Sequence, residues 1–268
     1  MVVDLELLLL KVAIAPVFVG IISVIAQRYG PRTAGWLVAL PINTGTVLVV
    51  LTLTEGAAFA ASAAVGALLG IVSISAFGVG YARSALRFRW PVCLAVALLG
   101  FGVSTLVLDL TPELVIVDLA AAVLAVAFVL WMLPESEAPP SPPSPPRWEI
   151  PLRMLTAALL VIIITTVAGS LGSQLSGLLT PIPVFTITLV LFTHSREGPA
   201  PVFVFLKGLQ YGLFSFAAFC AVVAVLLEPY GLSVAIVAGL GTYLGVYGLV
   251  RLFLSRSARS EESSGQAT

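Results

Sequence analysis

Charged residues are scarce in this sequence: aspartate, glutamate, lysine and arginine make up only 10% of its 268 residues. Soluble globular domains carry about 25% charge, so the sequence does not fit that class. The single histidine and the two cysteines, Cys93 and Cys220, are far apart, so no metal site or other cofactor is expected. Each cysteine lies alone in an apolar run, and we interpret both as small core residues. The net charge is zero and the bases are scattered singly, so nucleic acid is not an expected partner.

Long apolar runs fill most of the chain, which is 59% hydrophobic with a mean hydropathy of +1.11. Runs of about 20 apolar residues are long enough to cross a bilayer as helices. Membrane barrels show alternating segments of about 10 residues instead, and this pattern is missing. The acidic start lacks the bases of a signal peptide, and we expect it to belong to the first span. The sequence predicts an all-α, polytopic helical membrane protein whose nine spans are 6–27, 34–54, 57–82, 90–108, 112–133, 151–170, 175–193, 200–227 and 230–254.

The bases fall mainly on one side of these nine spans. Eleven of the thirteen follow or close odd-numbered spans, and the two exceptions are Lys11 and Lys207. The positive-inside rule then predicts an amino terminus outside the cell and a carboxy terminus in the cytoplasm. Few lysines beside many alanines, valines and arginines favour a bacterium, and therefore its inner membrane.

A proline-rich segment divides the chain. Residues 134–150 combine many prolines with serine and glutamate, which predicts a stiff cytoplasmic linker; an SH3-type ligand is the alternative. The first repeat covers 1–133 with five spans, and the second covers 151–254 with four. Residues 255–268 are expected to form a disordered tail.

The two halves align without a gap at an offset of 142 (183 − 41). Fourteen of 48 aligned positions between Gly30 and Phe77 are identical. Matches of proline, threonine, glutamate and glycine indicate duplication, because compositional bias would mainly match alanine and valine. Five spans is an odd number, so the second copy would enter the membrane the opposite way round. The sequence therefore predicts an inverted-topology 5+4 repeat, an arrangement typical of secondary transporters.

Each copy carries a polar insert at the expected centre of the bilayer. A proline removes a backbone donor and frees carbonyls one turn before two threonines, a construction that transporter sites use. An alternative is that the prolines only kink the helices and the threonines bond to the preceding turn. Gln210 is a further pore-lining candidate. The predicted substrate-binding residues are Pro41, Asn43, Thr44, Thr46, Pro183, Thr186, Thr188 and Gln210.

Charges and small residues inside the spans give further hypotheses. Lys11 and Asp118 lie near the outer face, where they could form an ion pair; Asp118 could instead carry a coupling proton, or both could reach the interface. Three glycine pairs with four-residue spacing predict close helix packing: Gly66/Gly70, Gly208/Gly212 and Gly241/Gly245. We find no grouping of residues typical of an enzyme.

The second copy resembles short bacterial membrane proteins of the GlpM type. Their pattern of Gly-Leu, a proline followed by x-Phe, and a turn with Glu-Gly is matched by Gly177, Leu178, Pro183, Phe185, Glu197 and Gly198. The first copy keeps Gly35, Pro41, Glu55 and Gly56 but has Asn43 in place of the aromatic residue. More broadly, the inverted halves are similar to the drug/metabolite transporter superfamily. That resemblance implies transport of small organic solutes and assigns no binding residue.

The expected function is therefore secondary transport of a small solute by alternating access between the two repeats. The alternatives are a membrane scaffold or accessory subunit that transports nothing, and an intramembrane enzyme acting on lipid. The expected partners are the lipid bilayer, an unidentified small molecule and a second copy of the chain in a homodimer.

Overall fold

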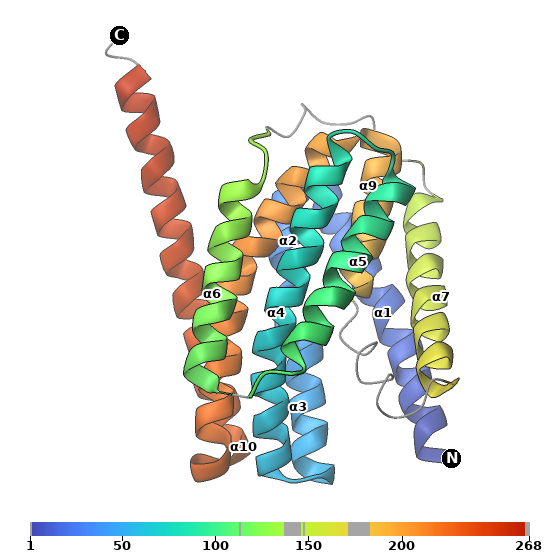
Figure 1. Ribbon diagram of the computed structural model, residues 1–268, viewed down its shortest axis with the longest axis vertical. Coiled ribbons are helices and arrows are strands. Elements are labelled where there is room, and N and C mark those ends of the chain that lie inside the picture. Colours follow the sequence, from blue (N-terminus) through green and yellow to red (C-terminus); the bar gives the residue numbers. More distant parts are fainter. Residues whose placement is uncertain (1, 113, 137–145, 147, 171–182, 266–268) are drawn as a thin grey trace. The chain divides into compact units, whose positions relative to one another are not determined.

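The computed structural model describes residues 2–112, 114–136, 146, 148–170 and 183–265 (Figure 1). Within these ranges the chain is helical and has no strand. Four helices are long and apolar enough to cross a bilayer: Ala57–Ala85, Trp90–Leu108, Val115–Met132 and Pro199–Arg256. The expected all-α fold is confirmed, and it fits a protein that crosses a membrane more than once. The helices are α1 (Val2–Tyr29), α2 (Pro31–Val38), α3 (Ile42–Thr54), α4 (Ala57–Ala85), α5 (Trp90–Leu108), α6 (Val115–Met132), α7 (Glu149–Ser170), α9 (Val184–Glu197) and α10 (Pro199–Gly265).

The chain divides into two compact units. Unit 1 consists of Met1–Val38, Val72–Thr111 and Ala127–Gln210. Unit 2 consists of Ala39–Ile71, Pro112–Val126 and Tyr211–Thr268. Both units therefore take segments from the first and second halves of the sequence.

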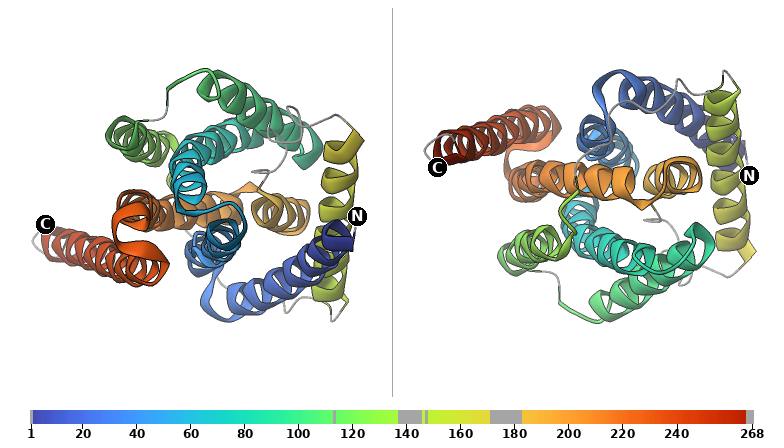
Figure 2. Two further views of the ribbon diagram at one scale, coloured as in Figure 1. Left: turned by 90° about the horizontal axis from the view of Figure 1, so that it is seen from below. Right: turned by 90° about the horizontal axis from the view of Figure 1, so that it is seen from above.

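Unit 1 is built around the packing of α1 on α7, which lie side by side in Figures 1 and 2. Helix α9 packs against α7, α1 and α5, and α2 lies against α1. The rings of Phe18 in α1 and Phe185 in α9 are 4.9 Å apart. Gly20 lets α1 approach α7 closely, because a methyl group there would lie 3.0 Å from the sulfur of Met154.

Two glycines bring the backbones of α2 and α10 together in unit 1. A Cβ on Gly35 would lie 2.5 Å from the nitrogen of Leu209 and 3.0 Å from the carbonyl carbon of Gly208. A Cβ on Gly208 would lie 2.9 Å from the carbonyl carbon of Arg32. Ordinary carbon contacts are about 3.5–4.0 Å, so only glycine fits at either position.

Unit 2 has a close contact within α10 itself. The helix is interrupted at Gly231, whose φ of 78° and ψ of 173° are not helical, two residues after Pro229. The segment that follows packs against the segment before: a Cβ on Gly239 would lie 2.9 Å from Val223 and 3.0 Å from Phe219. The sequence predicts separate spans at 200–227 and 230–254, and the interruption lies at the second residue of the later span.

The second predicted span is not one helix. Residues 34–54 were expected to form a single kinked span, but α2 ends at Val38 and α3 begins at Ile42. Pro41 is the N-cap residue of α3, with φ −76° and ψ 27°. A proline has no N–H and its ring clashes with the carbonyl four residues earlier, so the chain ends one helix and starts another. The prediction of a continuous span is wrong for this reason.

The carboxy-terminal end also differs from the expectation. Helix α10 continues to Gly265, whereas residues 255–268 were assigned to a disordered tail. The segment 255–264 contains neither proline nor glycine, so nothing in it stops a helix.

Two of the three glycine pairs do not pack as expected. A methyl group on Gly66, Gly70, Gly241 or Gly245 would meet no heavy atom of the described chain within 4 Å. Close packing is therefore not found at these four positions among the described residues. Gly208, by contrast, makes a tight backbone contact with α2. Spacing alone could not separate these cases, because it does not say which helix lies opposite.

Candidate functional site

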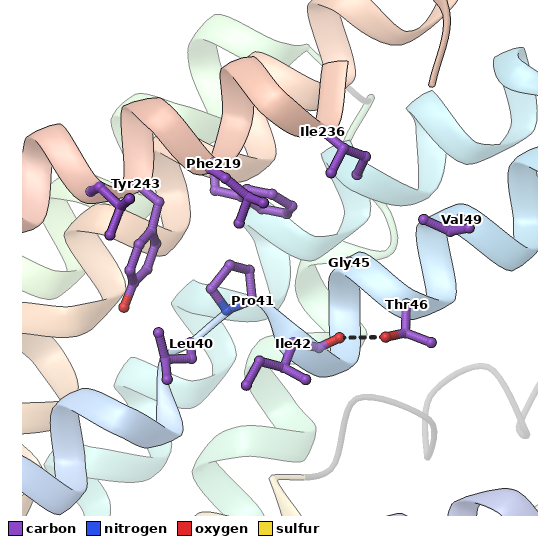
Figure 3. Close-up of a pocket in the computed structure, with 11 residues that line it drawn as sticks. Leu40, Pro41, Ile42, Gly45, Thr46, Val49, Phe219, Ile236 and Tyr243 are labelled. Atoms are coloured by element: carbon purple, nitrogen blue, oxygen red, sulfur yellow. Dashed lines mark hydrogen bonds between the residues drawn. The ribbon is translucent and has the colours of Figure 1, made fainter. Parts of the chain in front are cut away.

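An apolar pocket lies beside the helix start at Pro41, entirely within unit 2 (Figure 3). Its volume is about 460 Å³, which is within the range of small-molecule sites. Pro41 and Thr46 line one side, and the rings of Phe219 and Tyr243 line the other. The remaining lining residues are Leu40, Ile42, Gly45, Val49, Ile236, Leu240 and Leu244. No lining side chain carries a charge, so the pocket suits a neutral solute with a largely apolar surface.

Pro41 and Pro183 begin helices in the same way. Pro41 is the N-cap of α3, and its carbonyl accepts a hydrogen bond from the Gly45 N–H at 2.7 Å. Pro183 is the N-cap of α9, and its carbonyl accepts one from the Ile187 N–H at 2.9 Å. The first N–H groups of each helix have no acceptor inside the helix, so they need an acceptor from another part of the chain, from water or from a ligand.

The four candidate threonines differ in exposure. Thr44 is half-buried and Thr46 is exposed, and both belong to unit 2. Thr186 and Thr188 are fully buried in unit 1. The Thr46 hydroxyl donates to the Ile42 carbonyl at 2.8 Å, and the Thr188 hydroxyl donates to the Val184 carbonyl at 2.9 Å. These bonds to the preceding turn are the alternative that the sequence left open, and they occupy the hydroxyl protons at both positions.

Asp118 has a different position from the one expected. It was placed about two turns into its span, but α6 begins at Val115, so Asp118 lies in the first turn. Its carboxylate accepts a hydrogen bond from the Leu114 N–H at 2.9 Å, and the residue is 3% exposed. A carboxylate that caps an N–H at a helix start is stabilised by the helix dipole. The side chains of its proposed partner Lys11 and of Asn43 lie outside the described part of the chain.

Gln210 lies in α10 and is fully buried in unit 1. The Ser75 hydroxyl of α4 donates to its Oε1 at 3.1 Å. Its Nε2 atom has no hydrogen-bond partner among the described residues.

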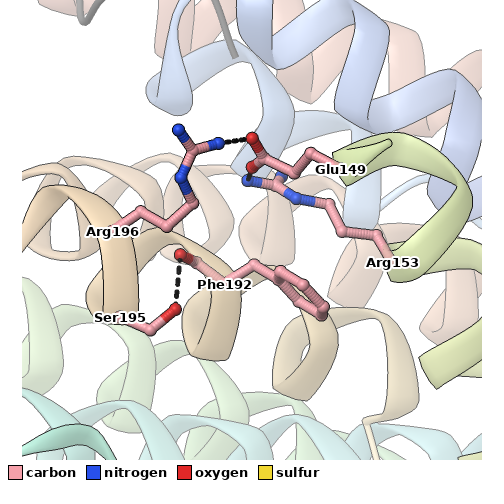
Figure 4. Close-up of polar contacts among 5 residues, drawn as sticks. All are labelled: Glu149, Arg153, Phe192, Ser195 and Arg196. Atoms are coloured by element: carbon pink, nitrogen blue, oxygen red, sulfur yellow. Dashed lines mark hydrogen bonds and ion pairs between the residues drawn. The ribbon is translucent and has the colours of Figure 1, made fainter. Parts of the chain in front are cut away.

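A buried ion cluster joins α7 to α9 in unit 1 (Figure 4). The Glu149 carboxylate is 1% exposed, accepts a hydrogen bond from Arg153 at 2.5 Å and is also paired with Arg196. The Arg153 guanidinium lies 5.5 Å from the ring centre of Phe192, a cation–π contact. Sequence reasoning missed this cluster because it placed Glu149 in the linker. The four-residue spacing of Glu149 and Arg153 on a helix was the available signal.

His194 at the end of α9 contacts Tyr81 of α4 within the same unit. The Tyr81 hydroxyl lies 3.0 Å from His194 Nδ1 and 3.4 Å from the Val190 carbonyl oxygen. Burial lowers the pKa of His194 from its ordinary value of 6.5. The described chain holds no group of three histidine, cysteine or acidic residues that could bind a metal ion.

These features define an all-helical protein whose apolar helices fit several crossings of a lipid bilayer. The chain matches no protein-family model, no curated protein and no solved structure. Its function is therefore inferred from the pocket, the helix starts and the buried polar groups.

Proposed function

We propose that this protein is a secondary transporter of a bacterial inner membrane that moves a small neutral solute by alternating access between two inverted repeats. The amino terminus would lie outside the cell and the carboxy terminus in the cytoplasm. The drug/metabolite transporters and the GlpM-type proteins that the sequence resembles would share this architecture.

One observation carries the proposal: helix starts recur in the register of the sequence repeat. Pro41 precedes α3 and Pro183 precedes α9, an offset of 142 (183 − 41). Helices α4 and α10 begin at Ala57 and Pro199, which differ by the same offset (199 − 57). The turns before them contain Gly56 at φ 97° and Gly198 at φ 81°, a backbone conformation that favours glycine. Shared boundaries support duplication, and helices broken within the membrane are typical of transporter binding sites.

The apolar pocket supports a neutral solute as cargo. A charged group at the depth of a span would need a charged partner, and none of the pocket's lining side chains supplies one. The hydroxyl of Tyr243 and the first N–H groups of α3 would provide orientation, and the aliphatic and aromatic side chains would provide affinity.

The proposal is tested by cysteine accessibility in a background with Cys93 and Cys220 replaced. Thr46→Cys reports on the pocket, and Thr188→Cys reports on the corresponding position of the second copy. Val47→Cys is the matched control, because Val47 is 42% exposed on the same helix but does not line the pocket. A membrane-impermeant thiol reagent is applied from each face in turn.

Alternating access predicts that the reagent labels both Thr46→Cys and Thr188→Cys. In any one conformational state, the two cysteines should be reached from opposite faces of the membrane. Labelling of Thr46→Cys should exceed that of Val47→Cys by at least tenfold in rate. Protection of Thr188→Cys from both faces would contradict the proposal. That result would favour a membrane scaffold, which the threonine bonds to Ile42 and Val184 also fit, because such bonds complete the helices without a ligand.

A further inference from the structure

The amide of Gln210 is the most unusual polar group in the interior of unit 1. The residue has no exposed surface, and the Ser75 hydroxyl holds its Oε1 at 3.1 Å. Its Nε2 carries two protons and has no acceptor among the described residues. Buried polar side chains are normally fully hydrogen-bonded, so this half-satisfied amide calls for a partner outside the described part of the chain.

Packing does not require an amide at this place. The position aligned with Gln210 in the first copy is Leu68 (210 − 142), which is also fully buried. A leucine would fill a similar volume without a buried donor. The choice of glutamine therefore indicates a polar role.

Helix α4 approaches the amide closely at Gly78. Gly78 of α4 is one turn from Ser75, and a Cβ on Gly78 would lie 3.2 Å from Nε2. Any larger residue at 78 would press on the amide. Glycine at this point therefore lets the donor end of Gln210 lie against α4.

Gln210 and Ser75 both lie near the middle of the part of their helices that would cross a bilayer. Gln210 lies about three turns after the start of α10 at Pro199, and Ser75 lies about three turns before the end of α4 at Ala85. At about 1.5 Å per residue these are depths of roughly 15–17 Å, half of a hydrocarbon core of about 30 Å. One neutral amide cannot offset the cost of a charge at this depth, so its ligand must be uncharged.

We propose that Ser75, Gly78 and Gln210 form a midplane binding site for one uncharged oxygen acceptor. Ser75 fixes the amide through Oε1, Gly78 lets the amide lie against α4, and Gln210 Nε2 donates to the ligand oxygen. That oxygen belongs either to a water molecule or to a carbonyl of the solute. The carbonyl case rests on the proposed transport function, and the water case does not.

The test observes the Gln210 side chain directly. The full chain is labelled with side-chain ¹⁵N-glutamine and placed in nanodiscs of phosphatidylethanolamine and phosphatidylglycerol. Glutamine occurs at positions 27, 174, 210 and 266, so few signals are expected, and Gln210→Leu identifies the one of interest. Exposed Gln27 provides the reference for contact with water. Cyclohexanone is the carbonyl probe, and methylcyclohexane, which lacks the oxygen, is its control.

A water cross-peak at the Gln210 amide would identify water as the ligand. A shift of the amide signals with cyclohexanone, and none with methylcyclohexane, would identify a carbonyl. An amide that gives no water cross-peak and responds to neither probe would overturn the site.

Two variants separate the site from general packing. Gly78→Ala should abolish the water cross-peak or reduce the cyclohexanone response at least tenfold, whereas Gly70→Ala should leave both unchanged, because a methyl there meets nothing within 4 Å. Ser75→Ala should broaden or shift the amide signals. Ser84→Ala, on the same helix, should not, because Ser84 bonds to the carbonyls of Gly80 and Tyr81. Equal effects of Gly78→Ala and Gly70→Ala would contradict the site.

The two proposals can fail separately. A wet Gln210 amide with Thr188→Cys protected from both faces would refute transport and keep the site. Alternating accessibility with a dry and unresponsive amide would refute the site and keep transport.

Discussion

The contact between α2 and α10 gives the sharpest test of the fold, because two glycines make it from opposite sides. In Gly35→Ala the new methyl would lie 2.5 Å from Leu209 nitrogen and still closer to the Phe205 carbonyl oxygen. In Gly208→Ala it would press on the Arg32 backbone from the other helix. Backbone atoms cannot rotate away as a side chain does, so the helices must separate by about 1 Å to restore ordinary contact distances.

The cost can be bounded from this geometry. Overpacking typically destabilises by about 1–3 kcal/mol, and alanine regains at most about 1 kcal/mol through its higher helix propensity. Gly70→Ala has the same gain in helix propensity, so relative to it we expect Gly35→Ala and Gly208→Ala each to lower the free energy of unfolding by about 1–3 kcal/mol. Gly66→Ala and Gly70→Ala should be neutral or stabilising, because their methyl groups meet nothing within 4 Å.

The double variant adds a second criterion. Once one methyl has separated the helices, the other needs less further movement, so the combined cost should fall short of the sum of the two by about 0.5 kcal/mol or more. The assay is reversible unfolding in bicelles, with the four single variants and Gly35→Ala/Gly208→Ala measured together. Full additivity, or a Gly35→Ala variant as stable as Gly70→Ala, would refute the close approach.

Three further predictions concern the ion cluster, the histidine and the turns. Glu149→Gln should lower the free energy of unfolding by about 3–5 kcal/mol, because it leaves Arg153 buried without its anion. Arg196→Gln should lower it less, because the Arg196 side chain is 32% exposed. Denaturant titration compares the two variants, and equal effects would contradict the burial of the Glu149–Arg153 pair. Burial lowers the pKa of His194 in the folded state, so at pH values between the folded and unfolded pKa the unfolded state binds more protons. The stabilising contribution of neutral His194 is therefore present above pH 6.5, and stability falls as the pH drops below that value. Unfolding midpoints at pH 8 and 5.5 should differ more in the unmodified protein than in His194→Gln, and an equal difference in both would remove His194 as the cause. Gly56→Ala and Gly198→Ala should each lower the free energy of unfolding by about 1–2 kcal/mol, because both positions have a left-handed backbone conformation. Gly102→Ala in helix α5 should not lower it, because a methyl group there meets open space. Thermal melts of the three variants test this difference.

The helical class and most helix boundaries could be predicted from the sequence, because apolar length and glycine or proline punctuation are local signals. The turns at Gly56 and Gly198 follow from the repeated Glu-Gly pairs. The break before α3 was expected only as a kink, because sequence gives the position of Pro41 but not how far the chain departs from helical geometry.

The candidate site could be predicted only in part. Pro41 and Thr46 do line a pocket, but its opposite wall comes from Phe219 and Tyr243, which lie far along the chain in α10 and which no local pattern indicates. The Ser75 partner of Gln210 and the Arg196 partner of Glu149 were missed for the same reason. Pairings between distant segments depend on which helices meet, and a single sequence does not specify this.

The packing of α1 on α7 has a consequence for the order of synthesis. Helix α1 ends at Tyr29 and its partner α7 does not begin until Glu149. At about 5–20 residues per second, α1 leaves the ribosome roughly 6–24 s before its partner is made. During that interval Gly20 lacks the Met154 side chain that lies against it in the folded chain. The nascent chain must therefore keep its first helix at the insertion machinery, or in lipid beside it, until the second half arrives.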